Sequence, residues 1–417
     1  MEGKPQALAG IRIIDLSMGW AGPLACRHMA DMGADVIKVE SCERFDWWRS
    51  WEATPEWIED DGAEKSTAFN TVNRNKRNIT LDLEDPEGRD LLLQLVATSN
   101  AVVENYSGSV LPKLNLGYDV FREVNDKIIL MSMPAFGSTG PWASFRAYGS
   151  TVEQSSGLPH LTGLQEDAPT MMHVALGDAN GGLNGASALL VALRHQARTG
   201  KGQFVDLSQV EALFPLAAHG ILEQSATGSA PPRDGNVNRD YAPHGVYPCA
   251  GEDKWIVIEA RNDAEFSALQ GVVGKSLASF GDAADRLQRR DELDAALGAW
   301  TASREPAEAE AILRAAGTSA SRTYGPGDVL NSDHLKERGF WQWLERAVVG
   351  NQPNPSAAYR VAGGGPFPIA TPAPTLGQHN AEVLSGVLGL TDADLHRLTE
   401  RGIIGNKPRM PGTGPQA

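Results

Sequence analysis

The chain has 417 residues, of which 41% are hydrophobic and 21% charged, a composition typical of a folded globular protein with about two or three domains. Acidic residues outnumber basic ones by 52 to 37, and the resulting net charge of −15 repels nucleic acid and anionic membrane surfaces, so neither is an expected partner. The three cysteines lack CxxC spacing, which argues against a zinc or iron–sulfur site and fits a reducing compartment. We therefore expect a cytoplasmic protein.

The N-terminal segment lacks the apolar core of a signal peptide, because charged residues interrupt it at Glu2, Lys4, Arg12 and Asp15. No apolar run elsewhere reaches the roughly eighteen residues needed to cross a bilayer. We expect an unprocessed protein that does not span a membrane.

Strand and helix patterns alternate along the first half of the chain. The predicted strands are 11–16, 35–40, 77–83, 101–106, 127–136 and 203–208, and the main predicted helices are 23–32, 87–99 and 177–199. Strands that alternate with helices indicate a doubly wound, largely parallel sheet, so the predicted fold class is α/β.

A segment rich in proline, glycine and asparagine near 225–243 predicts a domain boundary. Beyond it, a hairpin pattern (HGVYPC and KWIVIEA) and helical patterns at 263–273, 284–300 and 305–316 predict a smaller α+β domain. We predict a large domain at 1–224, the small domain with its linkers at 225–330, and a last segment at 331–417. That segment includes a helical stretch at 380–401, and it either returns to the large domain or wraps over a partner.

Two features could bind phosphate. The turn Gly19-Trp20-Ala21 lies between a strand and a helix, where backbone N–H groups attract anions, although the spacing is not GxGxxG and a purely structural turn is equally compatible. Arg74, Lys76 and Arg77 form a basic cluster, and Lys113 lies in the next connection. In an acidic protein these cations could neutralise a polyanionic ligand, but a solvated run of charges has the same pattern.

Asp178 stands between Gly177 and a glycine-rich helix start, where the helix dipole favours an ionised carboxylate. A plain helix cap explains the same position. Serine hydrolase, metalloprotease, P-loop and calcium-binding motifs (GxSxG, HExxH, GxxxxGK[ST] and the EF-hand loop) do not occur in the sequence, and the nine histidines have no metal-ligand spacing.

Several segments occur together in one order: LAGIRIIDLS, AGP and ADMGADVIKVE (8–40), NRNKRNITLDL (73–83), VVENYSGSVLPKLNLGY (102–118), FGSTGPW (136–142), ALGDANGG (175–182) and RTGKGQFVDLSQVEAL (198–213). This ordered set resembles the class III CoA-transferases, the family of formyl-CoA and carnitine-CoA transferases. The resemblance covers nearly the whole chain. It implies a Rossmann-like large domain completed by the last segment, a small domain near 225–330, and an interlocked dimer.

The resemblance also implies a mechanism. An aspartate at the position of Asp178 attacks an acyl-CoA thioester to give a mixed anhydride, and the released thiolate then forms an aspartyl-CoA thioester. The implied reaction is transfer of CoA to a carboxylic acid, with CoA as part of the substrate and no metal, redox or other prosthetic group. Family positions expected to contact CoA are Gly19, Trp20, Ala21, Asn73, Asn75, Lys76, Arg77, Asn105, Tyr106, Lys113, Leu114 and Tyr148.

The chain departs from the formyl-CoA transferases at two positions. Trp20 stands where they have glutamine, which argues against a formyl or oxalyl substrate, and Ser41 stands where they have a basic residue. Arg44 is a candidate to replace that charge. The glycine run that forms their mobile active-site loop is also absent near 235–245.

The sequence is also compatible with other functions. Racemases of the same fold, which invert 2-methylacyl-CoA, pair the aspartate with a histidine where this chain has Tyr148-Gly149, and His160 and His173 do not match that position. A non-catalytic CoA- or nucleotide-binding subunit is a third possibility. A hetero-oligomer with a related subunit is also compatible with the sequence.

Overall fold

The computed structural model describes residues 6–172, 175–360 and 365–410, which form two compact units. Unit 1 contains residues 1–159, 171–230 and 334–417, and unit 2 contains 160–170 and 231–333. The predicted boundaries at 224/225 and 330/331 are close to these, but residues 160–170 join the second unit, which the sequence did not indicate.

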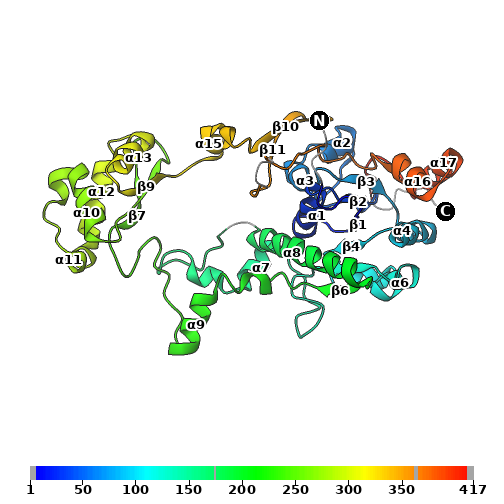
Figure 1. The fold of residues 1–417 in the computed structure, drawn as a ribbon, viewed down its shortest axis with the longest axis horizontal. Helices are drawn as coiled ribbons and strands as arrows, with labels where there is room; N and C mark the ends of the chain where they lie inside the picture. Colours follow the sequence, from blue (N-terminus) through cyan, green and yellow to red (C-terminus); the bar gives the residue numbers. More distant parts are fainter. Residues whose placement is uncertain (1–5, 173–174, 361–364, 411–417) are drawn as a thin grey trace. The chain divides into compact units, whose positions relative to one another are not determined.

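Unit 1 is built on a six-stranded parallel sheet in the order β3-β2-β1-β4-β5-β6 (Figure 1). Its strands are β1 (Arg12–Asp15), β2 (Asp35–Glu40), β3 (Arg77–Thr80), β4 (Ala101–Glu104), β5 (Ile129–Ser132) and β6 (Gln203–Asp206). All five pairings are parallel. This is the strand order of a doubly wound Rossmann fold, and the predicted α/β class is confirmed.

Helices cover both faces of this sheet. The helices of the first 230 residues are α1 (Ala21–Asp31), α2 (Pro55–Glu59), η1 (Gly62–Glu64), α3 (Thr67–Val72), α4 (Pro86–Ala97), α5 (Val110–Lys113), α6 (Tyr118–Val124), α7 (Gly149–Gln154), η2 (Leu158–Leu161), α8 (Leu176–Thr199), η3 (Glu211–Leu213) and α9 (Ala218–Thr227). Most of the short helices follow strands and were missed in the sequence, because four to seven residues give too little periodicity to recognise.

Helices α1 and α8 pack side by side on one face of the sheet (Figure 1). Small residues allow this: a Cβ atom added at Gly182 would lie 2.8 Å from the backbone oxygen of Ala21, and one at Gly185 would lie 2.6 Å from Met133 Cε. The glycine-rich first half of α8 is therefore a close-packing surface, as its composition predicts. The packing brings the N-terminus of α8 next to that of α1.

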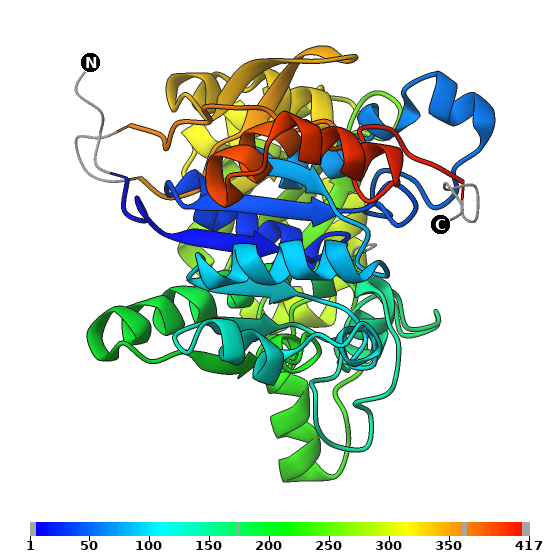
Figure 2. The same cartoon turned by 90° about the vertical axis from the view of Figure 1, so that its right-hand side faces the viewer.

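The last segment completes the opposite face of the sheet. It contains α15 (Asp333–Glu337), the antiparallel hairpin of β10 (Trp341–Arg346) and β11 (Gly350–Pro355), α16 (Asn380–Leu388) and α17 (Asp392–Glu400). Val383, Leu384 and Leu398 are buried in the same core as α4 and the strands. Figure 2 shows these C-terminal helices, in red, beside the blue strands. The predicted helical stretch at 380–401 is two helices, because Gly389 has φ = +76° and ends α16.

Unit 2 is a small α+β unit with its own core. Its sheet is antiparallel and contains β7 (His244–Pro248), β8 (Trp255–Glu259) and β9 (Ser319–Arg322). Its helices are α10 (Asp263–Val273), η4 (Gly274–Leu277), α11 (Ala283–Gln288), α12 (Arg290–Thr301), α13 (Pro306–Ala315) and α14 (Pro326–Asn331). The hairpin and the three helical regions predicted here are all present.

Candidate active site

The sheet of unit 1 reverses its strand order between β1 and β4, and the carboxyl ends of strands at such a point are where doubly wound folds bind ligands. A pocket of about 630 Å³ opens there. It is lined by residues that follow β1, β2, β4, β5 and β6, together with the starts of α7 and α8. The lining residues are Met18, Trp47, Asn105, Tyr106, Ser107, Val110, Pro134, Ala135, Phe145, Arg146, Ala147, Tyr148, Gly149, Thr151, Asp178 and Gln209.

Asp178 lies in this pocket, in the first turn of α8, with only 8% of its surface exposed. Its Oδ2 atom accepts a hydrogen bond from the Gly149 N–H group at 3.1 Å. Burial raises the pKa of Asp178 from 3.8 to about 6, against the smaller, lowering influence of the backbone N–H groups of Gly149 and Ala21. The carboxylate is thus oriented, weakly solvated and still ionised at neutral pH.

Gly149 leaves no space for a side chain beside this carboxylate. A Cβ atom at Gly149 would lie 2.1 Å from Asp178 Oδ2 and 3.1 Å from Ala175 Cα. Any larger residue would displace the Asp178 carboxylate.

Aromatic side chains form one wall of the pocket. Trp47 stacks on Trp51 with ring centroids 4.4 Å apart, and Tyr148 meets both rings edge-on at 5.4 and 5.3 Å. A Cβ atom at Gly19 would lie 2.2 Å from the Trp47 ring, so the glycine, with φ = +73°, makes room for this wall. Tyr148 is half-exposed and lines the pocket.

The first turn contributes mainly backbone. The Gly19 N–H group donates to Asp46 Oδ1 at 2.8 Å. The centroid of the Trp20 ring lies 5.3 Å from that of Trp48. The Ala21 N–H group helps to lower the pKa of Asp178. Gly19, Trp20 and Ala21 are not among the residues that line the pocket, whereas the preceding Met18 is.

Asn105 and Tyr106 join the two strands at the switch point. The Asn105 side chain accepts from the Met18 N–H group at 2.8 Å and donates to the Met18 carbonyl at 2.7 Å, so it fixes the turn after β1 to the turn after β4. Tyr106 lies at the junction with a second pocket of about 520 Å³. The two pockets share Met18, Tyr106 and Val110 and are therefore adjacent.

The second pocket contains the predicted residues Lys113 and Leu114, and also Ser41 and Arg44. Lys113 is exposed, and no ion-pair partner for it occurs in the described parts of the chain. Arg44 lies on the same pocket and pairs with Glu84 at 2.8 Å. Arg44 thus lies on the same pocket as Ser41, the position at which the formyl-CoA transferases have a basic residue.

Lys76 does not supply charge to either pocket. Its ammonium group is fully buried and donates to Asp15 Oδ2 at 2.8 Å, to the Pro23 carbonyl at 2.9 Å and to Asn73 Oδ1 at 2.8 Å. All three ammonium hydrogens have protein acceptors, so no donor remains for a phosphate. The side chains of Lys76 and Asn73 thus form a buried polar cluster with Asp15 under the first turn, and contact of these two residues with CoA stays a prediction.

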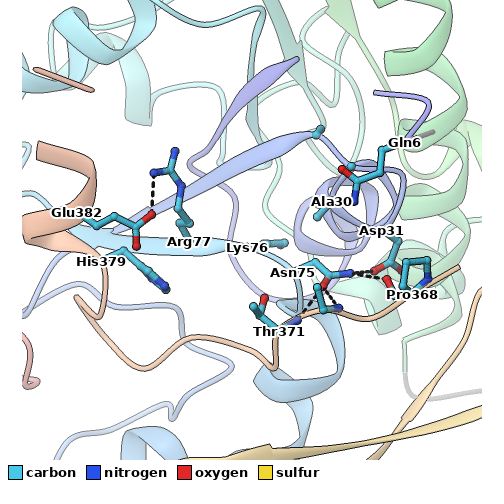
Figure 3. A pocket seen from close by; sticks show the side chains of 13 residues that line it. Gln6, Ala30, Asp31, Asn75, Lys76, Arg77, Pro368, Thr371, His379 and Glu382 are labelled. Carbon is cyan, nitrogen blue, oxygen red and sulfur yellow. Dashed lines mark hydrogen bonds and ion pairs between the residues drawn. The ribbon is translucent and has the colours of Figure 1, made fainter. Parts of the chain in front are cut away.

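Arg77 and Asn75 lie at a third pocket, shown in Figure 3, at the amino ends of the strands. Arg77 is the first residue of β3 and pairs with Asp35, the first residue of β2, and with Glu382. Asn75 bonds to Asp31 and to the backbone of the return segment at 368–371. Amino and carboxyl ends of parallel strands lie on opposite edges of a sheet, so Arg77 and Asn75 lie at the edge opposite Asp178. Their contact with CoA stays a prediction.

Trp47, Arg146 and Gln209 line the Asp178 pocket but were not predicted. The cluster of tryptophans at 47–57 was a visible signal for the first, because aromatic residues rarely concentrate in a loop without a packing partner or a ligand. No pattern in the sequence indicated that Arg146 would line this pocket. Within the described ranges, no three His, Cys, Asp or Glu side chains are grouped so that they could hold a metal ion.

The protein is therefore of the doubly wound α/β class, with a buried carboxylate at the switch point of its sheet that a backbone N–H group holds in place. A sequence profile of CoA-transferase family III matches residues 8–380. The chain therefore belongs to this family, and both the recognition of the family and the predicted enzyme class are confirmed.

Curated relatives have names that agree with this assignment. The probable CoA-transferase Rv1866 of Mycobacterium tuberculosis is 33% identical over 413 residues, which are 95% of this chain but only 50% of that longer protein. The succinyl-CoA–D-citramalate CoA-transferase of Chloroflexus aurantiacus is 31% identical, covering 97% of this chain and 99% of its own length. The succinate–glutarate CoA-transferase of Agrobacterium fabrum is 37% identical over 66% of this chain and 68% of its own length.

Among solved structures, a CaiB/BaiF family protein from Brucella suis superimposes with a TM-score of 0.83 at 30% identity, covering 92% of this chain and 100% of that one. The fold is thus shared over nearly the whole length. No helix within the described residues is both long and apolar enough to cross a bilayer.

Proposed function

We propose that the protein transfers CoA from an acyl-CoA thioester to a carboxylic acid, with Asp178 as the covalent nucleophile. The observation that carries this proposal is the state of Asp178: a carboxylate 8% exposed, oriented by a backbone N–H group, in a pocket at the switch point. Weak solvation makes a carboxylate a better nucleophile than it is in water.

The reaction needs no added oxidant and no net proton transfer. An Asp178 oxygen bonds to the thioester carbonyl carbon, the C–S bond breaks, and CoA leaves as a thiolate. The thiolate attacks the Asp178 carbonyl of the mixed anhydride, which forms the aspartyl-CoA thioester and releases the donor acid. The acceptor carboxylate repeats these two steps in reverse order, so that the new acyl-CoA leaves and Asp178 is regenerated. In this scheme CoA is a substrate and the enzyme has no prosthetic group.

The pocket favours a transferase over a racemase. Inversion at C2 requires a base on each face of the acidic carbon. Of the residues that line the pocket, Asp178, Arg146, Tyr106 and Tyr148 are the ionisable ones, and neither an arginine nor a tyrosine is a suitable base near neutral pH. His160 belongs to unit 2, and His173 lies outside the described residues.

The proposed function predicts ping-pong transfer and no racemisation. A screen of acyl-CoA donors against carboxylic acids, analysed by mass spectrometry, should detect new thioesters. A 2-methylacyl-CoA incubated with the enzyme in heavy water should keep its C2 hydrogen. Deuterium uptake at the turnover rate would support the isomerase instead, and binding of CoA with no transfer to any acid would support the non-catalytic subunit.

We further propose that the second pocket holds the phosphate groups of CoA, with Lys113 and Arg44 as the cations. Lys113→Gln should raise the KM for acyl-CoA about tenfold, because a charged hydrogen bond contributes roughly 1.5–3 kcal/mol. Arg44→Gln should have a smaller effect, since Arg44 is already paired with Glu84. Glu84→Gln should lower KM by removing a repulsive charge. A KM unchanged by Lys113→Gln at every salt concentration would contradict this placement.

The predicted interlocked homodimer and the cytoplasmic location remain proposals. Support for the dimer comes from apolar side chains that unit 1 leaves exposed along α8 and α9: Leu183, Val191, Ile221 and Leu222 are between 48% and 70% exposed. Helix α9 buries only Gly220 within the chain. A second copy that covers these helices would remove this apolar surface from water.

A further inference from the structure

The Asp178 pocket has two charged lining residues, Asp178 itself and Arg146. Arg146 is exposed, and neither a hydrogen bond nor an ion pair joins its guanidinium group to any described residue. In a chain of net charge −15, about half of the described arginines in unit 1 pair with a carboxylate, as Arg49, Arg74 and Arg77 do. An unpaired arginine in the pocket of a nucleophilic carboxylate can receive an anion.

Arg146 is close to the reacting group along the chain. It precedes Gly149, whose N–H group holds Asp178, by three residues, so the two Cα atoms are at most about 11 Å apart. The arginine side chain can cover much of that distance. Three aromatic side chains, Trp47, Phe145 and Tyr148, line the same pocket and offer apolar surface to a bound chain of methylene groups.

We infer that Arg146 binds the distal carboxylate of a dicarboxylic substrate, and this inference rests on the proposed transferase function. The carboxyl group that reacts, or its thioester, lies at Asp178. The methylene groups lie along the aromatic wall, and the second carboxylate reaches the Arg146 guanidinium, which can bind it through two parallel hydrogen bonds. The pocket thus selects short dicarboxylic acids over monocarboxylic acids of the same length.

The test compares succinate with butyrate, and glutarate with valerate, as acceptors for wild type and Arg146→Gln. We expect the ratio of kcat/KM for the dicarboxylate to that for the matched monocarboxylate to fall about tenfold in Arg146→Gln, mainly through KM for the dicarboxylate. Arg146→Lys should retain part of the preference, because it keeps the charge but loses the two-pronged geometry.

Arg198→Gln is the matched control. It removes the same charge from an exposed arginine at the far end of the helix that carries Asp178, about 30 Å away, and should leave the ratio unchanged. An equal loss for both classes of acid in Arg146→Gln would overturn the inference and assign Arg146 to CoA, and an unchanged ratio would also overturn it. If wild type transferred CoA to neither class of acid, the proposed function itself would fail.

Discussion

Replacement of Asp178 by asparagine should lower kcat by about 10⁴-fold or more, since loss of a catalytic nucleophile typically has an effect of this size. CoA binding and the fold should persist, because the amide oxygen can still accept the hydrogen bond from the Gly149 N–H group. Steady-state transfer assays and calorimetric titration with CoA measure the two effects separately. Wild type incubated with acyl-CoA and then hydroxylamine or borohydride should carry the modification on the peptide that contains Asp178.

The raised pKa of Asp178 adds a pH signature. Only the ionised carboxylate attacks the thioester, so kcat/KM for acyl-CoA should be constant above about pH 6 and fall about tenfold per pH unit below it. The same shift affects stability. The folded state holds the proton more tightly than the unfolded chain, so its stability decreases as pH rises from about 4 to about 6, and the lower stability persists above that.

Asp178→Asn removes this dependence. The rise in the pKa of Asp178 from 3.8 to about 6 corresponds to about 3 kcal/mol of unfolding free energy above pH 6. Burying the amide N–H₂ group of the asparagine offsets part of this gain. The variant should therefore gain about 1–3 kcal/mol of unfolding free energy at pH 8 and little at pH 4. Asp119→Asn, an exposed acidic residue in the first turn of α6, is the matched control and should change neither turnover nor stability appreciably. Full activity in Asp178→Asn, once deamidation is excluded by mass spectrometry, would contradict the assignment.

The sequence predicts much of the fold because strand patterns and helix patterns alternate along the first half of the chain. The βαβ unit at 11–40, the glycine-rich helix that carries Asp178 and the hairpin of unit 2 all follow from local patterning. Asp178 itself was identified by its place at a helix start and by family resemblance. Local sequence does not record what surrounds that carboxylate. Gly149 contacts it and Arg146 lines the same pocket, and both belong to a segment whose path depends on tertiary packing.

The basic cluster shows why charge patterns alone mislead. Arg74, Lys76 and Arg77 are consecutive or nearly so, yet each has a different environment. Arg74 is buried against Asp31, Lys76 against Asp15, and Arg77 is half-buried at the amino edge of the sheet. Their partners are more than forty residues away in sequence, so the pairing is invisible until the sheet is assembled. Lys113 has no such partner among the described residues, so its ammonium group is free to bind an anionic ligand.

This distinction gives Lys76 a different predicted phenotype from Lys113. Lys76→Met should lower the free energy of unfolding by about 3–5 kcal/mol, because it leaves the Asp15 carboxylate buried without its counter-charge. Although burial acts to raise the pKa of Asp15, Lys76 and Lys38 hold it below its ordinary value, so loss of Lys76 should also raise that pKa and make the variant less unstable at low pH. Chemical denaturation at pH 8 and pH 5 measures both effects.

The double variant Asp15→Asn/Lys76→Met tests the cause. It removes both charges, and the asparagine oxygen can still accept from the Ser17 N–H group, so it should recover much of the stability that Lys76→Met loses. Lys113→Gln, in contrast, should raise KM without lowering stability, because its side chain is exposed. If Lys76→Met instead left stability unchanged and raised only the KM for acyl-CoA, Lys76 would bind phosphate after all, and the buried pair with Asp15 would have to open when CoA binds.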